Sequence, residues 1–373
     1  MTFEFEAALE TIATTIVAKH AGEIDAGAFP SQAIKALGEA GLLGLVSSPD
    51  VDGKGLGLPE AVHVVERLAR ACASTAMVVT MHYAATVVLE QLGPKDIRQA
   101  IAAGKHLSTL AFSEAGSRSQ FWVPMSTATA DGNDVKLTAS KSWVTSAHHA
   151  DSYVWSSRPL AGQELSSLWL VLRKTTGLHI PDAGFDGLGL RGNDSSPIAA
   201  EGARIPASCR LGDDGAGFGV MMGTVLPWFN VLSASVSNGI MEAALARTVA
   251  HVTATKFAHA GNGLADLPTI RAYLARMRIK TDHNKALVAD TLTAMGTNRP
   301  DTMLRVLESK AAAGESATEV TDLAMRICGG AAFRKESGVE RAFRDARAAV
   351  VMGPTTDVLY DFIGKAVCGV PLF

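Results

Sequence analysis

Three kinds of hydrophobic pattern follow one another along the chain. Residues 3–104 repeat apolar side chains at helical spacing, as in Leu9, Ile12 and Ile16, which predicts amphipathic helices. Residues 107–210 contain short β-prone runs separated by polar turns, and residues 215–373 return to helical repeats. The pattern therefore predicts an α+β protein that is mainly α, with its strands in the middle.

The β section contains a clear hairpin signal. Polar residues 125–130 lead into Asp131-Gly132-Asn133-Asp134, which favours a tight turn, and residues 135–145 form the return strand. Residues 168–172 are continuously apolar, as in a strand buried on both faces. We expect an antiparallel, β-barrel-like domain.

Long helical patterns make up the C-terminal part of the chain. Pro227 interrupts the first pattern, which covers residues 218–259, and should kink or restart that helix. Together the patterns predict three domains, which are an N-terminal helical domain (1–106), a middle β domain (107–212) and a C-terminal four-helix bundle (213–373).

Composition narrows the class of protein. The 373 residues are 47% hydrophobic, and 34 basic against 37 acidic residues leave a net charge of −3. This balance favours neither a nucleic-acid partner nor a membrane surface, and we expect no segment that is apolar over the length of a bilayer. The cysteines lack metal-like or disulfide spacing, which predicts structural thiols, no metal site and a cytoplasmic location; they are Cys72, Cys209, Cys328 and Cys368.

Common nucleotide motifs are missing from the sequence. The Gly-rich residues 53–59 lack G-K-[ST], and no G-x-G-x-x-G follows a predicted strand, which argues against a phosphate loop and a Rossmann domain. Trp143 and Thr145 could instead place an aromatic ring and a hydroxyl against a planar cofactor. From spacing alone, a core tryptophan beside a β-forming threonine is the favoured interpretation.

An ordered set of motifs favours the cofactor interpretation of Trp143 and Thr145. The segments are Ser113-Glu114-Ala115-Gly116-Ser117-Arg118-Ser119, Lys141-Ser142-Trp143-Val144-Thr145, Ala150-Asp151, Gly187-Leu188-Gly189-Leu190-Arg191-Gly192, Ile205-Pro206 with Leu211-Gly212, Ile327-Cys328-Gly329-Gly330 and Arg344-Asp345-Ala346-Arg347. In type and order they resemble the signatures of the acyl-CoA dehydrogenase superfamily. The resemblance covers nearly the whole chain.

This resemblance implies a bound flavin, usually FAD, with FMN as the alternative, between the β domain and the bundle of a homotetramer or homodimer. Carried over by motif position, Leu110, Phe112 and Ser113 would line the flavin, Trp143 would pack on it and Thr145 would hydrogen-bond to it. Ser119 would lie near phosphate or the substrate thioester. Thr355 would contact cofactor or pantetheine at a helix start. Gly330 would also contact the cofactor, and Arg326 would reach its pyrophosphate across a subunit boundary.

The chain departs from the family where the base should be. The glutamate that removes the α-proton in ordinary members falls on Gly353 here, and its alternative place falls on residues 226–230, which contain no carboxylate. Trp228 and Phe229 in that segment would face the substrate. The replacement candidates are His149 and Asp357, although a surface-loop pair with His148 and a helix cap, respectively, are the favoured interpretations. The catalytic residue therefore stays unassigned.

Basic residues also change around the expected cofactor. Lys256 stands where the family has an arginine, Arg326 replaces a glutamine, and Arg118 replaces a small residue. Each could contact phosphate or simply be solvated.

Three functions follow from these departures. The first is flavin-dependent α,β-dehydrogenation of an acyl thioester, with electrons passed to an electron-transfer flavoprotein. The second is a flavin-dependent monooxygenase that works with a flavin reductase and oxygen on a smaller or aromatic substrate. The third is a base-less, non-catalytic subunit of a hetero-oligomer.

Overall fold

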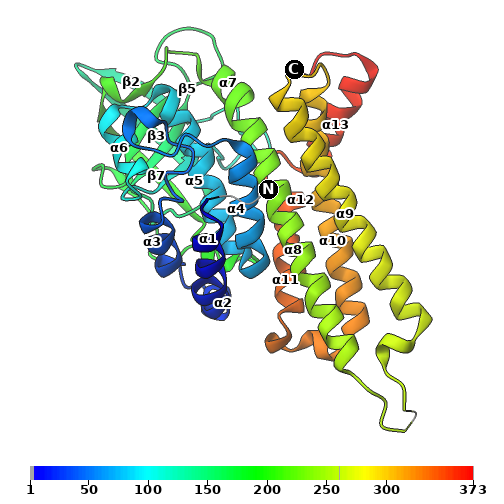
Figure 1. The fold of residues 1–373 in the computed structure, drawn as a ribbon. Coiled ribbons are helices and arrows are strands. Elements are labelled where there is room, and N and C mark those ends of the chain that lie inside the picture. Colours follow the sequence, from blue (N-terminus) through cyan, green and yellow to red (C-terminus); the bar gives the residue numbers. More distant parts are fainter. Residues whose placement is uncertain (1–3, 260, 373) are drawn as a thin grey trace.

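Helices form both ends of the chain, and strands lie between them (Figure 1). The computed structural model describes residues 4–259 and 261–372. The N-terminal helices are α1 (Glu6–Ile12), α2 (Ala18–Asp25), α3 (Ser31–Glu39), α4 (Leu58–Ala71), α5 (Ala73–Leu92) and α6 (Lys95–Ala102). The predicted class, mainly helical with a middle β domain, is confirmed.

Helices α4 and α5 show how local sequence sets these elements. The Glu60 carboxylate accepts a hydrogen bond from Gly57 N at 2.9 Å, and Pro59 lies in the first turn of α4. Both features stabilise a helix start. α5 is buried over most of its length, because its apolar side chains surround the helix instead of forming one stripe.

The β domain consists of two four-stranded sheets. One has the order β1-β4-β5-β8 and the other β2-β3-β7-β6. The strands are β1 (Ser108–Ala111), β2 (Thr127–Asp131), β3 (Asp134–Val144), β4 (Ser152–Ser157), β5 (Ser167–Leu172), β6 (Leu178–His179), β7 (Ser196–Pro206) and β8 (Arg210–Leu211). The predicted hairpin is β2–β3, and its turn residue Gly132 has a φ of +65°.

Two details of the sheets differ from the prediction. β1 pairs with β4 in parallel, because a long loop and the β2–β3 hairpin separate these strands along the chain. β5 is buried as expected except at Leu172, its last residue, which is 46% exposed.

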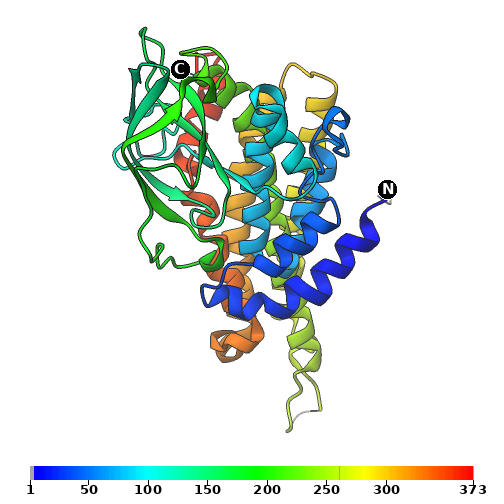
Figure 2. The same cartoon turned by 90° about the vertical axis from the view of Figure 1, so that its left-hand side faces the viewer.

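The three long C-terminal helices, α8 to α10, pack side by side, and shorter helices precede and follow them (Figures 1 and 2). The C-terminal helices are α7 (Gly217–Val220), α8 (Leu226–Ala254), α9 (Pro268–Gly296), α10 (Thr302–Cys328), α11 (Val339–Ala346), α12 (Ala348–Val351) and α13 (Thr356–Cys368). A π-helical turn over Met221–Val225 immediately precedes Pro227, so the helix is irregular where proline removes a backbone donor.

The continuous helical run Gly217–Ala254 passes the length and hydropathy test for a membrane span, with a mean hydropathy of 1.3. The expectation that no segment would do so is therefore wrong. The helix is apolar because it is a core element, and 61% of its most apolar window is buried within the protein, where it packs against α4 and α10.

Arg344 of α11 connects segments that are far apart in the sequence. Its guanidinium donates to the Asp25 carboxylate at 2.6 and 2.9 Å and to Leu188 O at 3.1 Å. The neighbouring Asp345 accepts from Leu190 N at 2.7 Å. These bonds attach the 187–193 loop of the β domain to both helical parts.

Candidate active site

A cavity of about 1000 Å³ lies where the β domain meets the helices. Its walls come from α5, the end of β1, the 113–121 loop, the end of β3, the 185–195 loop, α8 and the segment that joins α12 to α13. An apolar cluster made of residues from α5, β1, β4, β5, α8 and α13 supports it. A concave, largely apolar space of this size is typical of a cofactor or substrate site.

Trp143 reaches the cavity because β3 contains a bulge. Lys141 pairs with Ile198 of β7 but Val144 pairs with Ser196, so β3 has one residue more than its partner strand. Trp143 in this bulge has a φ of +56° and is 58% exposed. It stacks on Phe185 with 4.2 Å between ring centroids. A bulky residue in the left-handed region is a strained feature that points to a functional position.

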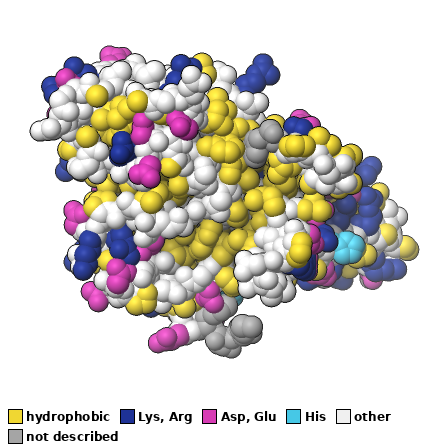
Figure 3. All heavy atoms as spheres, turned by 90° about the horizontal axis from the view of Figure 1, so that it is seen from above, with side chains coloured by type: hydrophobic (Ala, Val, Ile, Leu, Met, Phe, Trp, Pro, Cys, Tyr) yellow, Lys and Arg dark blue, Asp and Glu magenta, His cyan; other side chains and the backbone are white. Residues whose placement is uncertain are grey.

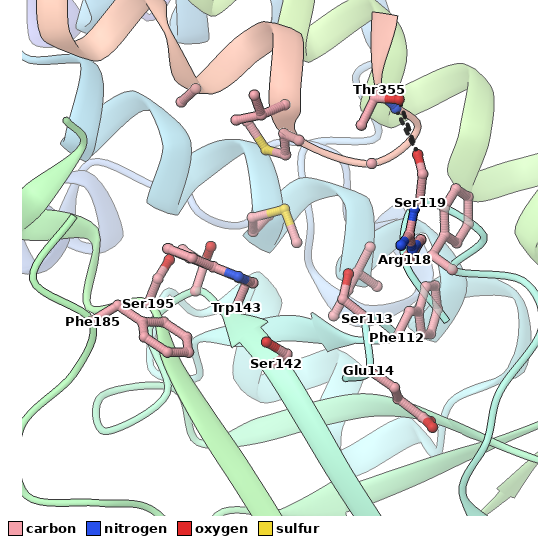
Figure 4. A pocket seen from close by; sticks show the side chains of 18 of the residues that line it. Phe112, Ser113, Glu114, Arg118, Ser119, Ser142, Trp143, Phe185, Ser195 and Thr355 are labelled. Atoms are coloured by element: carbon pink, nitrogen blue, oxygen red, sulfur yellow. Dashed lines mark hydrogen bonds between the residues drawn. The ribbon is translucent and has the colours of Figure 1, made fainter. Parts of the chain in front are cut away.

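The strand ends bring most of the predicted cofactor residues to one wall. Leu110 ends β1 with Ala111, Phe112 and Ser113 follow, and all of them except Ala111 line the cavity. Ser113 O accepts from Ser142 N at 2.9 Å, which holds this segment beside Trp143. Thr145 also lines the cavity and is buried. The favoured core interpretation of Trp143 is therefore wrong, since its ring is exposed to the cavity (Figure 4).

A buried ion pair lies next to this wall. Lys141 Nζ donates to Glu114 Oε1 at 2.5 Å, and both side chains are fully buried. Lys141 also donates to Ser156 O and Oγ, and Glu114 accepts from Met125 N and from Ser126. Burial lowers the pKa of Lys141 to about 8, while the charge of Glu114 opposes that shift. Glu114 borders the cavity, yet its carboxylate points away from Trp143 (Figure 4).

Ser119 and Thr355 both line the cavity and contact each other at its edge. Thr355 N donates to Ser119 Oγ at 2.9 Å (Figure 4). Thr355 is the N-cap residue of α13, where the helix dipole favours an anion. The structure thus brings together two residues that are 236 positions apart in the sequence.

Gly353 also lines the cavity, in the segment between α12 and α13. A Cβ built on Gly353 would make ordinary contacts with Ser119, of 3.4 to 3.8 Å, so the backbone has room for a side chain. Behind this segment, Lys310 of α10 is buried and donates to three backbone carbonyls. Burial lowers the pKa of Lys310 to about 7.

The 187–193 loop approaches the helices too closely for side chains. A Cβ at Gly189 would lie 2.5 Å from Arg344 O, and one at Gly192 would lie 2.3 Å from the Ile24 side chain. These glycines let the loop lie on α11 and α2, which places Leu190 and Arg191 at the cavity. Burial raises the pKa of Asp345, which anchors the loop at Leu190 N, to about 6.

Several predicted site residues lie outside the cavity. Phe229 lines it, but Trp228 packs against the helical core, because neighbouring residues on a helix point in directions about 100° apart. Its prediction as a substrate contact in this cavity is wrong. Arg326 is exposed beside the Tyr273 ring, and Gly330 is exposed after α10. Their contact with a cofactor across a subunit boundary stays a prediction.

Neither candidate base reaches the cavity. His149 stacks on Phe29 with 3.9 Å between ring centroids, and its partial burial lowers its pKa. Its neighbour His148 is bonded to Asp194 and to Pro181 O. Asp357 is exposed in the first turn of α13 and forms no side-chain cap of that helix. We therefore reject His149 and Asp357 as bases within this cavity.

Sequence reasoning gave no role to several residues that line the cavity, and four of them serve as examples. Met77 and Met81 come from α5, and Phe185 and Arg191 come from the loop after β6. The methionines are four residues apart in an all-round apolar helix, so no polar face marked them. Phe185 lies in a Gly-rich stretch that offers no periodic signal.

The residues present fit a planar aromatic cofactor. Trp143 and Phe185 present ring surfaces, Thr145 and Ser142 present hydroxyls beside them, and Ser119 and the N-terminus of α13 provide polar groups farther along. A flavin needs this combination of an apolar platform, hydrogen-bonding groups and an anion-binding end.

Comparison with known protein families identifies all three parts of the chain. Residues 3–104, 109–203 and 215–368 match the N-terminal, middle and C-terminal domains of acyl-CoA dehydrogenase. The chain is 29% identical over 355 residues to a probable acyl-CoA dehydrogenase of Bacillus subtilis, covering 92% of this chain and 91% of that one. It is 30% identical over 340 residues to the mitochondrial short-chain specific acyl-CoA dehydrogenase of Bos taurus, covering 88% and 81%.

Solved structures share the fold. The glutaryl-coenzyme A dehydrogenase in complex with glutaryl-CoA superimposes with a TM-score of 0.92 at 21% identity and covers 100% of this chain and 97% of that one. The butyryl-CoA dehydrogenase of Megasphaera elsdenii gives a TM-score of 0.89 at 22% identity and covers 99% of both chains. The protein belongs to the acyl-CoA dehydrogenase family.

Proposed function

We propose that the protein dehydrogenates an acyl thioester between its α- and β-carbons with a bound flavin, most simply FAD. Membership of the family makes it a flavin-dependent oxidoreductase. The observation that carries the proposal is the exposed, strained Trp143 beside Thr145 in a cavity large enough for cofactor and substrate together.

The residues around the cavity divide into two groups. Trp143, Thr145 and Ser113 would hold the flavin, which supplies a hydride acceptor when bound. Ser119, Phe229 and the segment around Gly353 would hold the thioester and its acyl chain. The apolar walls exclude water from this part of the cavity, which strengthens any polar contact to the reacting group.

The proposal leaves the α-proton without a carboxylate acceptor at the family position. Gly353 has no proton-accepting group, and Glu114, the one carboxylate among the described cavity residues, is bonded to Lys141 and Ser126. A glutamate with those partners cannot serve as a free base. We therefore expect substrates whose α-proton is already acidic.

Anaerobic mixing with short and aromatic acyl-CoA thioesters tests the proposal. The absorbance of the bound flavin should bleach with at least one of them. Persistent colour with every thioester would refute dehydrogenation, and a purified protein without flavin would refute all flavin chemistry.

The absence of a free carboxylate favours a second candidate, a flavin-dependent monooxygenase. Such a reaction needs no base for an α-proton, because oxygen is activated at the reduced cofactor. It predicts oxygen uptake only when a flavin reductase and substrate are present. A non-catalytic subunit would instead show no turnover alone and would co-purify with a partner chain.

We also propose that copies of the chain assemble through the helical part. Large apolar side chains are exposed on or beside α10 and α13, including Phe333 at 83%, Val367 at 71% and Tyr360 at 46%. Seen from above, hydrophobic side chains gather in the middle of the molecule (Figure 3). Exposed apolar surface of this kind is typical of an interface, and light scattering would distinguish dimer from tetramer.

A further inference from the structure

Lys310 is a buried lysine that has no carboxylate partner among the described residues. It lies on α10, is 1% exposed and forms no ion pair with any described side chain. Buried lysines without a counter-charge are rare, because the ammonium loses its hydration. Such a group persists when other hydrogen bonds replace that water.

The ammonium instead binds the backbone of the cavity wall. Lys310 Nζ donates to Ala349 O at 3.2 Å, to Met352 O at 2.9 Å and to Pro354 O at 2.7 Å. Three donors thus match three acceptors. The same Nζ lies 6.0 Å from the centre of the Phe229 ring, another part of the wall.

The wall needs this support because its own hydrogen bonds are few. α12 has only four residues, so the carbonyls at its C-terminus lack helical partners. Proline at position 354 has no N–H group. On the cavity side, Thr355 N is bonded to Ser119 Oγ. Lys310 therefore holds the segment from behind, and Ser119 holds it from the front.

We propose that Lys310 is a positioning residue of the reaction. By binding three carbonyls, it fixes residues 349–354 at the distance from Ser119 and Phe229 that a substrate requires. Lys310 does not touch the substrate itself and is absent from the cavity lining. This inference rests on the proposed function only where turnover is measured.

Two substitutions distinguish a role of Lys310 in positioning the cavity wall from a role only in the stability of the fold. Lys310→Met keeps the length of the side chain and removes all three donors. Lys310→Arg keeps a charged donor. Lys365→Met is the control, because Lys365 on α13 also donates to a backbone carbonyl, Leu372 O, but is partly exposed, pairs with Asp361 and is absent from the cavity lining.

Hydrogen exchange of the flavin-loaded protein is the first measurement. Lys310→Met should speed exchange in peptides covering residues 349–356 by about tenfold or more, the effect expected from losing a charge-assisted hydrogen bond. Lys310→Arg should restore part of the protection, and Lys365→Met should leave it unchanged. Unchanged exchange in Lys310→Met would overturn the proposal, even if the protein proves inactive on every thioester.

Steady-state kinetics gives the second measurement. A displaced wall should raise KM for the thioester in Lys310→Met while the flavin content stays at the wild-type level. A lower kcat with unchanged KM would indicate only fewer folded molecules and would contradict positioning. If Lys310→Met does not fold, Lys310→Gln, which keeps two N–H donors, provides the same two comparisons.

Discussion

Lys141 Nζ and Glu114 Oε1 lie 2.5 Å apart in an ion pair that is fully buried beside the strand carrying Trp143. Lys141 also joins the two sheets, because it lies in β3 and its ammonium donates to Ser156 O and Oγ of β4 in the other sheet. The ion pair therefore holds the end of β3 in place, directly before the bulge that presents Trp143 to the cavity.

Removing one member of this pair should destabilise the protein more than removing both. Lys141→Met leaves a buried carboxylate without its counter-charge, which typically costs about 3–5 kcal/mol in unfolding free energy. The double variant Lys141→Met/Glu114→Gln should lose less stability than Lys141→Met alone, and therefore less than the sum of the two single variants. Denaturant unfolding measures all three, and additive losses would contradict a coupled pair.

Relieving the strain at Trp143 should separate stability from cofactor binding. Trp143→Gly removes a left-handed conformation that costs about 1–2 kcal/mol in a non-glycine residue, and it gives up little buried area because the ring is exposed. We expect an unchanged or higher Tm together with a lower flavin content. Asn298→Gly, at a φ of 51° after α9, is the control and should keep its flavin. Equal flavin content in both variants would show that Trp143 does not contact the cofactor.

A carboxylate at position 353 should supply a base to the cavity, whose described lining has Glu114, bonded to Lys141, as its one carboxylate. Gly353→Glu has room at Cβ, and a placed general base typically contributes about 10²–10⁴-fold to rate. The rate of flavin bleaching by a thioester should rise above that of wild type. Gly364→Glu, on an exposed part of α13 with open space around it, is the matched control. No gain in Gly353→Glu would indicate that the proton leaves by another route.

His82 should make stability fall in mild acid. Burial lowers its pKa to about 4, and its ring is bonded to Leu43 O and Ser108 N. A group whose pKa is lower in the folded state stabilises the protein above its unfolded pKa, near 6.5, and loses that contribution as pH falls toward 4. The shift corresponds to about 3 kcal/mol.

Unfolding at pH 7 and pH 4.5 measures this effect against His82→Gln, which cannot titrate. The wild type should lose more stability than the variant over this interval. An equal loss in the two proteins would assign the acid sensitivity to groups other than His82. Asp345 would not be one of them, because its pKa is raised to about 6 and its protonation stabilises the folded state as the pH falls.

Local chemistry explains which parts of the fold the sequence could predict. The turn at Gly132 depends on residues next to one another, and its prediction is confirmed. The start of α4 at Pro59 and Glu60 is set by local residues in the same way. The bulge at Trp143 depends on the register between β3 and β7, strands about 50 residues apart. Propensity cannot reveal such a register.

In the candidate site too, some residues could be placed from the sequence and others depend on contacts between distant segments. The motif residues Leu110, Phe112, Thr145 and Thr355 line the cavity, since the resemblance already contains their three-dimensional arrangement. His149 could not be placed, because its partner Phe29 lies 120 positions earlier in the chain. Trp228 is different, because its direction about 100° from Phe229 on the helix already made a shared cavity face doubtful, and the structure packs it against the helical core.

The loop anchored by Arg344 and Asp345 bears on the order of events during protein synthesis. Its attachment points form only after the ribosome has added residues 344 and 345, and the wall around Gly353 is made later still. A nascent chain that ends before α11 has the β domain and α5 but no closed cavity. We therefore expect a flavin to be enclosed only after α11 and the segment around Gly353 have been made, and a variant truncated before α11 to purify with less flavin than the full chain.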